Sequence, residues 1–172
     1  MKEVAILLLL AIMLNGCGSS GAVQSPSASV WQAQMSGGVG GTAPSDPGSA
    51  GFSFNTQFTV SSGGTLSISS FQLLNSDTCY GNVGPTPSGT LTVTYNSADQ
   101  ITGGTFSFTI PSSAGDTVTL TSTAITGTVN PNNYYNLGNV TITGTWALVP
   151  ASSGSSCVAA SGTFTMTQGN AT

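Results

Sequence analysis

Apolar and polar residues alternate with a period of two over most of the chain from Phe52 onward. Apolar residues take every second position in segments that include Phe52/Phe54, Phe58/Val60, Leu91/Val93/Tyr95, Phe106/Phe108/Ile110, Val118/Leu120, Val140/Ile142, Trp146/Leu148 and Phe164/Met166. The positions between them carry mostly small polar residues. Because successive side chains of a strand point to opposite faces, the pattern predicts half-buried β-strands. No segment after residue 16 has the period of a helix.

One segment interrupts this regularity. The apolar positions run Leu66/Ile68 and then Phe71/Leu73, so they change parity near Ser69-Ser70. A single extra residue in one strand of an antiparallel pair has this effect. The change therefore predicts a β-bulge at this point.

The predicted strands are short, numerous and separated by turn-rich sequence, which indicates an all-β protein. Exposed edge strands are usually protected by charge, above all by Lys, and no Lys follows Lys2. Closing a sheet removes its edges altogether. We therefore expect an antiparallel meander that closes into a small barrel of about eight strands, with a two-sheet β-sandwich as the alternative.

The N-terminal residues have the organisation of a signal peptide. Lys2 supplies a positive charge, and an apolar run extends from Val4 to Leu14. This run is too short to span a membrane, which takes about 20 residues. The residues Leu14-Asn15-Gly16-Cys17 then resemble the lipobox of bacterial lipoproteins, with an aliphatic residue three positions before the Cys and a small residue directly before it.

This resemblance to bacterial lipoproteins implies cleavage before Cys17 and lipidation of that residue, so that acyl chains anchor the mature protein in a membrane. The implied location is the cell envelope, and Gly18, where inner-membrane lipoproteins carry Asp, favours the outer membrane of a Gram-negative cell. Residues 1–16 are then the signal peptide, 17–29 the lipidated Cys17 with a flexible tether, and 30–172 an all-β domain. Within the domain, Val30 to Met35 is a candidate first strand, and the Gly/Pro-rich residues 36–51 indicate a loop.

Composition excludes several kinds of partner. The chain has one Lys or Arg, five Asp or Glu and no His. After Cys17 the acidic residues are Asp46, Asp77, Asp99 and Asp116, and there is no basic residue. Without cationic side chains the domain cannot neutralise phosphates, so we expect no nucleic-acid binding and no basic contact with anionic lipids. Apolar residues still make up 38% of the chain, so low charge does not indicate disorder.

Cys79 and Cys157 are the cysteines that remain once Cys17 is assigned to lipid. An even pair in an exported domain predicts a structural disulfide. It would close a loop of about 79 residues, which the chain-entropy model values at roughly 4–5 kcal/mol. Two thiols without His or nearby acids make a poor metal site.

Candidate catalytic chemistry is sparse. A Ser or Cys nucleophile needs a base, and the mature chain has no His, Lys or Glu. Paired carboxylates can hydrolyse glycosides, and Asp99 and Asp116 are the nearest pair in sequence. Both lie in turn-like sequence, where Asp ordinarily bonds its own backbone, so we interpret them as exposed turn residues. We predict no catalytic residue, no metal site and no cofactor.

Threonine recurs at the polar positions of two predicted strands. The rows are Thr117/Thr119/Thr121/Thr123 and Thr141/Thr143/Thr145. Flat threonine ladders occur on ice-binding solenoids, but these rows lie on unequally spaced strands. We therefore interpret them as ordinary surface residues of a sheet.

Three functions remain open. The first is a non-enzymatic cell-envelope lipoprotein whose β domain is structural or contacts another surface component. The second is a small β-barrel carrier of an apolar ligand, which requires an open apolar interior. The third is an Asp-dependent hydrolase, which requires clustered acids. Besides the membrane that holds the anchor, candidate partners are an unidentified envelope protein, a glycan or an apolar ligand.

Lipidation at Cys17 can be tested by mass. Expressed in a lipoprotein-competent bacterium, the full chain should yield a product that begins at Cys17 and carries acyl mass, because acyl chains are what hold it in the membrane. The Cys17→Ser replacement should release the protein from the membrane fraction into the soluble fraction or mislocalise it. Intact mass spectrometry and fractionation measure both, and a mature product without acyl mass would contradict the prediction.

Overall fold

The computed structural model describes residues 29–39, 53–61, 63–74, 84–129 and 139–169. These contain eight strands: β1 (Ser29–Val39), β2 (Ser53–Val60), β3 (Leu66–Leu73), β4 (Ser88–Tyr95), β5 (Ile101–Pro111), β6 (Thr117–Gly127), β7 (Val140–Val149) and β8 (Ala160–Gln168). No helix among the described residues is long and apolar enough to cross a membrane.

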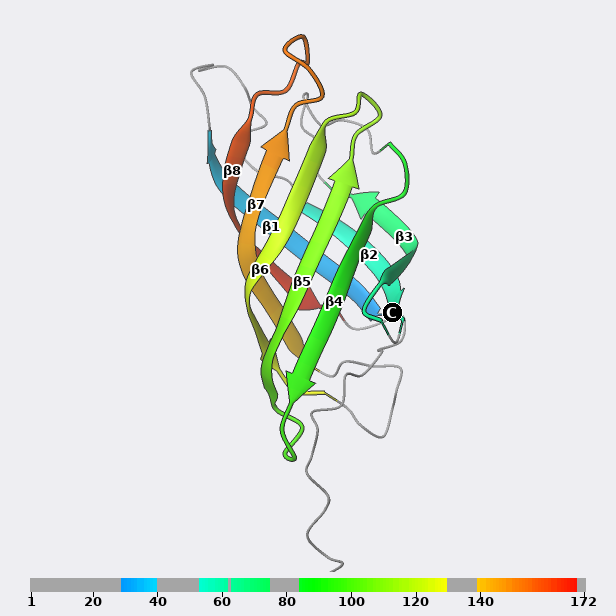
Figure 1. The fold of residues 1–172 in the computed structure, drawn as a ribbon, viewed down its shortest axis with the longest axis vertical. Helices are drawn as coiled ribbons and strands as arrows, with labels where there is room; N and C mark the ends of the chain where they lie inside the picture. The colour runs from blue at the N-terminus through cyan, green and yellow to red at the C-terminus, as the bar shows by residue number, and fades with distance from the viewer. Residues whose placement is uncertain (1–28, 40–52, 62, 75–83, 130–138, 170–172) are drawn as a thin grey trace, which may run out of the picture.

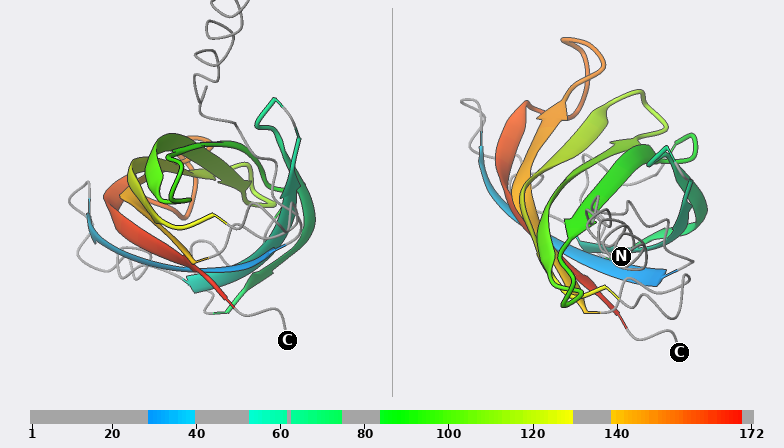
Figure 2. Two further views of the ribbon diagram at one scale, coloured as in Figure 1. Left: turned by 90° about the horizontal axis from the view of Figure 1, so that it is seen from below. Right: turned by 60° about the horizontal axis from the view of Figure 1, so that its bottom comes forward.

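All eight strands belong to one antiparallel sheet in the order β3-β2-β1-β8-β7-β6-β5-β4. Chain neighbours are sheet neighbours except between β3 and β4, and the first strand pairs with the last. The sheet is strongly curled, so that β2 and β3 lie behind β4 and β5 in Figure 1 and face them across the interior in Figure 2. The prediction of an all-β, antiparallel protein is confirmed.

The two edge strands approach each other at one place. Thr65 and Thr90 form an isolated antiparallel bridge, and the Leu91 N–H donates to the Gly64 carbonyl oxygen at 2.8 Å. No continuous ladder joins β3 to β4 among the described residues. The structure therefore establishes the all-β antiparallel class, and full closure into a barrel stays a prediction.

The predicted bulge lies in β3. Gln57 of β2 pairs with Ser70, and the next residue, Phe58, pairs with Ile68, so Ser69 is the extra residue. The Ser69 hydroxyl donates to the Gln57 carbonyl oxygen at 3.1 Å. The change of parity in the sequence thus located the bulge correctly.

The first strand is longer than the sequence indicates. β1 includes the expected residues 30–35 but continues to Val39, where Gly37 pairs with Gly162 and Val39 with Ala160 of β8. The prediction that residues 36–39 begin a loop was therefore wrong. Glycines are weak strand formers, and here pairing with β8 outweighs that preference.

The interior of the curled sheet is filled by aromatic side chains. The rings of Phe54 on β2 and Phe108 on β5 lie 5.9 Å apart, and Phe71 of β3 stacks on Phe54 at 5.0 Å. The Phe106 ring lies 5.9 Å from the Phe108 ring and 6.3 Å from the Phe164 ring of β8, measured between ring centroids. Because these rings come from both sides of the curl, they close its interior with ring-to-ring contacts.

Gly144 allows β6, β7 and β8 to pack closely. A Cβ at this position would collide with the Thr121 carbonyl oxygen and lie 2.6 Å from the Phe164 ring. The missing side chain therefore provides the space in which the Phe164 ring lies. A buried strand glycine here is explained by packing.

Phe108→Ala should destabilise the protein strongly, because Phe108 is fully buried and contacts three other phenylalanines. We expect a loss of about 3–5 kcal/mol in the free energy of unfolding, measured by urea denaturation. Val149→Ala is the control: Val149 is 59% exposed, and its loss should stay within about 0.5 kcal/mol. A Phe108→Ala loss no larger than that of Val149→Ala would contradict the packing described here.

Candidate functional site

Asp116 is the described residue whose environment differs most from its sequence interpretation. It follows the β5–β6 turn and its side chain is fully buried. Its Oδ1 accepts from the Ala151 N–H at 2.8 Å and from the Ser155 hydroxyl at 2.7 Å, and its Oδ2 accepts from the Ser112 hydroxyl at 3.2 Å. The interpretation of Asp116 as an exposed turn residue was therefore wrong.

The partners of Asp116 are themselves held in place. The Asp116 N–H donates to the Ser112 Oγ at 3.0 Å, and the Ser112 N–H donates to the Asp116 carbonyl oxygen at 2.7 Å. The Ser155 Oγ accepts from the Cys157 N–H at 3.0 Å. The carboxylate thus ties the β5–β6 turn to the β7–β8 connection, and three of its roughly four acceptor sites are used.

Two opposing effects act on this carboxyl group. Burial raises the pKa of Asp116, but hydrogen bonds from Ala151, Ser155 and Ser112 favour the charged form more strongly, so the pKa lies below its ordinary value of 3.8. Asp116 is therefore ionised at neutral pH. A general acid needs a proton at the working pH, which this group does not hold.

Asp99 lies at the other end of β5. It has a left-handed backbone conformation, with φ of 61°, and its carbonyl oxygen accepts from the Val129 N–H at 2.8 Å. The preceding Asn96 closes the turn by accepting from the N–H groups of Ala98 and Gln100. Asp99 thus lies in a turn as expected, but it is partly buried, and the side chain that closes the turn is that of Asn96.

The structure does not bring Asp99 and Asp116 together. They lie beyond opposite ends of β5, which runs from Ile101 to Pro111 and at about 3.4 Å per residue spans roughly 35 Å. Paired carboxylates of glycosidases lie within about 10 Å of each other. Among the described residues no group of three His, Cys, Asp or Glu side chains could hold a metal ion.

Other residues singled out in the sequence lie outside the described ranges. These are Cys17, Asp46, Asp77 and Cys79. Cys157 is described and is buried, with 4% of its surface exposed. Its pairing with Cys79 therefore stays a prediction.

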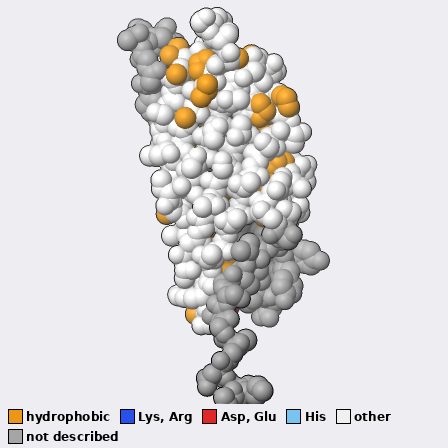
Figure 3. All heavy atoms as spheres, viewed as in Figure 1, with side chains coloured by type: hydrophobic (Ala, Val, Ile, Leu, Met, Phe, Trp, Pro, Cys, Tyr) orange, Lys and Arg blue, Asp and Glu red, His pale blue; other side chains and the backbone are white. Residues whose placement is uncertain are grey.

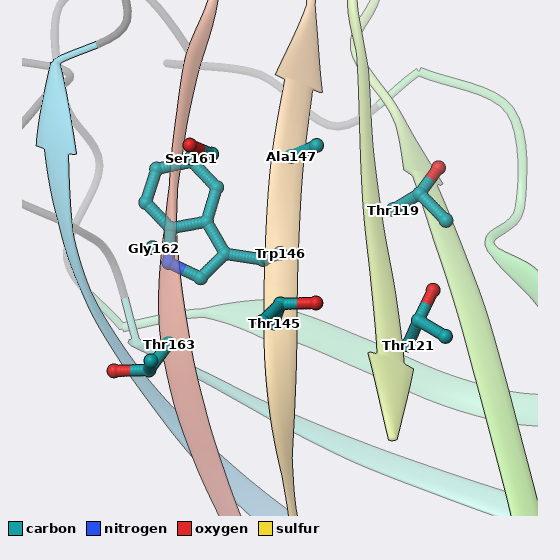
Figure 4. Close-up of a pocket in the computed structure, with 8 residues that line it drawn as sticks. All are labelled: Thr119, Thr121, Thr145, Trp146, Ala147, Ser161, Gly162 and Thr163. Carbon is teal, nitrogen blue, oxygen red and sulfur yellow. The ribbon is translucent and has the colours of Figure 1, made fainter. Parts of the chain in front are cut away.

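A shallow hollow lies on the outer face of the sheet, over β6, β7 and β8 (Figure 4). Its volume is about 480 Å³, and its lining includes Thr119, Thr121, Thr145, Ala147, Ser161 and Thr163. Ala147 pairs with Ser161 across the β7–β8 ladder, and both side chains are shorter than the surrounding threonines. The hollow exists because this pair forms a low floor between taller neighbours. The threonines are apparent in the sequence, but the hollow is not, because it depends on the register between strands.

Comparisons with models of protein families, with curated proteins and with solved structures found no match for this chain.

The low pKa of Asp116 makes stability depend on pH in one direction. The unfolded chain binds a proton near pH 3.8 and the folded protein only at lower pH, so stability should be constant above about pH 5 and fall as pH drops through 4. Asp116→Asn should remove most of this fall. Thermal unfolding of both proteins between about pH 2.5 and 7 measures it.

Asp99→Asn is the matched control, because it removes a carboxylate outside the Asp116 hydrogen bonds. This variant should keep the wild-type dependence on pH. If Asp116→Asn lost stability in acid as steeply as the wild type, the assignment to Asp116 would be wrong.

Proposed function

We propose that the protein is a non-enzymatic, lipid-anchored protein of the cell envelope whose filled β domain is structural or presents a surface for interaction. The observation that carries this proposal is the interior itself. Phe54, Phe106 and Phe108 are at most 1% exposed, and the Phe108 ring stacks on both of the others. A carrier of apolar ligands needs an open interior, and here protein side chains occupy that space.

The acidic residues support the same proposal. The Asp116 carboxylate accepts hydrogen bonds from Ala151, Ser155 and Ser112, so it is engaged in holding the fold. Asp99 lies beyond the far end of β5, in a turn. Neither arrangement offers the proton transfer that an Asp-dependent hydrolase requires.

We propose further that the curled sheet acts as a closed barrel. The Thr65–Thr90 bridge and the hydrogen bond from Leu91 to Gly64 join β3 to β4 at one point. Closure there would remove two sheet edges that carry no Lys, Arg or Glu to protect them.

The pairing of β1 with β8 supports a position for the proposed anchor. Trp31 pairs with Gln168, so the start of β1 and the end of β8 lie at one end of the molecule. The β5–β6 turn and the β7–β8 connection lie at the opposite end (Figure 1). A tether of about 12 residues from Cys17 reaches roughly 20 Å. The end that carries Asp116 would then face away from the membrane. In a Gram-negative cell we propose that this is the outer membrane.

We keep the Cys79–Cys157 disulfide as part of this proposal. Cys157 is buried beside Ser155, whose hydroxyl binds Asp116. A covalent link at Cys157 would therefore reinforce the connection that the carboxylate already holds.

The filled interior can be tested with an apolar fluorescent probe. A soluble form that begins at Gly18, titrated with cis-parinaric acid, should show no saturable rise in fluorescence, because stacked aromatic rings fill the described part of the interior. The carrier alternative predicts saturable binding near one probe per chain. Such binding, reduced by enlarging an interior side chain such as Leu120→Phe, would overturn the proposed function.

A further inference from the structure

The outer face of the sheet carries an aligned row of hydroxyl groups. Register places five residues on neighbouring strands directly side by side: Thr90, Ser107, Thr121, Thr145 and Thr163. At about 4.8 Å between strands, the row extends for roughly 19 Å. Hydroxyl residues are therefore aligned between strands as well as along single strands. The alignment between strands cannot be seen in the sequence, where the strands are unequally spaced.

The next row contains the floor of the hollow. It runs Thr109, Thr119, Ala147 and Ser161. Ala147 and Ser161 are exposed but short, so the hollow of about 480 Å³ opens beside the longer row. In Figure 4 the Thr145 hydroxyl points from β7 towards β6, and Thr119 and Thr121 stand along the opposite side of the hollow.

The chemistry of this face is uniform. Each Thr or Ser hydroxyl can both donate and accept a hydrogen bond, and each Thr adds a methyl group. Figure 3 shows the face that carries β4 to β8. No charged side chain is visible on it, and the hydrophobic side chains lie mainly towards one end. Within the described chain the acids are Asp99 in the β4–β5 turn and the buried Asp116. A charged ligand would therefore find no opposite charge here.

We propose that this hollow and the adjoining hydroxyl row bind a neutral oligosaccharide that lies across strands β6, β7 and β8. Sugar hydroxyls donate and accept hydrogen bonds as Thr and Ser do, and the C–H faces of sugar rings match the threonine methyls. Between β6 and β8 the row extends for about 10 Å, which is longer than a single sugar ring, so the ligand is a chain of sugars. This inference rests on the proposed function, in which the outer surface of the domain makes the interaction.

Other ligand classes fit this face poorly. Nucleic acids and acidic glycans need cationic partners, and none is present after Cys17. An apolar partner needs a continuous exposed apolar area, whereas here the apolar surface comes largely from threonine methyl groups that stand beside hydroxyls. Neutral sugars need neither.

The test uses the full lipidated chain in phosphatidylcholine nanodiscs, which contain no sugar detergent. Isothermal titration with cellohexaose, chitohexaose, laminarihexaose and maltohexaose should give a saturable isotherm for at least one of them. Ala147→Phe fills the hollow and should weaken that binding at least tenfold. Thr145→Val keeps the shape but removes a hydroxyl, and should weaken binding severalfold.

Matched variants separate the hollow from the rest of the sheet. Ala124→Phe alters an exposed alanine of β6 outside the hollow, and Thr165→Val removes an exposed hydroxyl from β8 outside it. Both should bind like the wild type. Absence of binding to all four sugars, or equal weakening by Ala147→Phe and Ala124→Phe, would overturn the inference. Neither result touches the proposed function, whose test is the parinaric acid titration of the interior.

Discussion

The contact between Phe54 and Phe108 is the one on which the curl of the sheet depends. These residues belong to β2 and β5, which are five places apart in the strand order, yet their rings lie 5.9 Å apart. A flat sheet could not bring them together. Burial of apolar surface provides the main favourable free energy of folding, and in this sheet it is available only when the two halves curl towards each other.

Charge contributes little to this fold, and the one carboxylate that is buried among the described residues therefore matters more to it. Asp116 has no cationic partner, so hydrogen bonds alone compensate its loss of hydration. Two of its donors are hydroxyls and one is a backbone N–H. Ala151 and Ser155 lie more than 30 residues from Asp116 in the sequence, whereas Ser112 lies in the same turn. An ionised group that needs three specific donors fixes the relative position of the segments that supply them.

The sequence predicted what depends on local periodicity and missed what depends on register. Alternation of apolar residues identified the strands, and the change of parity identified the bulge at Ser69. Nothing near Asp116 in the sequence differs from an exposed turn, because Ala151 and Ser155 reach it only when β7 returns alongside β6. The hollow at Ala147 was hidden for the same reason, since its low floor needs Ser161 opposite.

Glycine residues lie at the one place where β3 approaches β4 in the described part of the chain. Gly64 has a left-handed φ of 84°, and a Cβ there would lie 3.0 Å from the Leu91 carbonyl oxygen. A Cβ at Gly89 would collide with the Ser107 carbonyl oxygen and lie 3.1 Å from Leu66. Glycine at position 64 therefore lets this segment approach the β4 backbone, whereas Gly89 leaves room for the neighbouring β5 backbone and for the Leu66 side chain. The two edges thus meet at one bridge, and the rest of each edge strand has no ladder partner among the described residues.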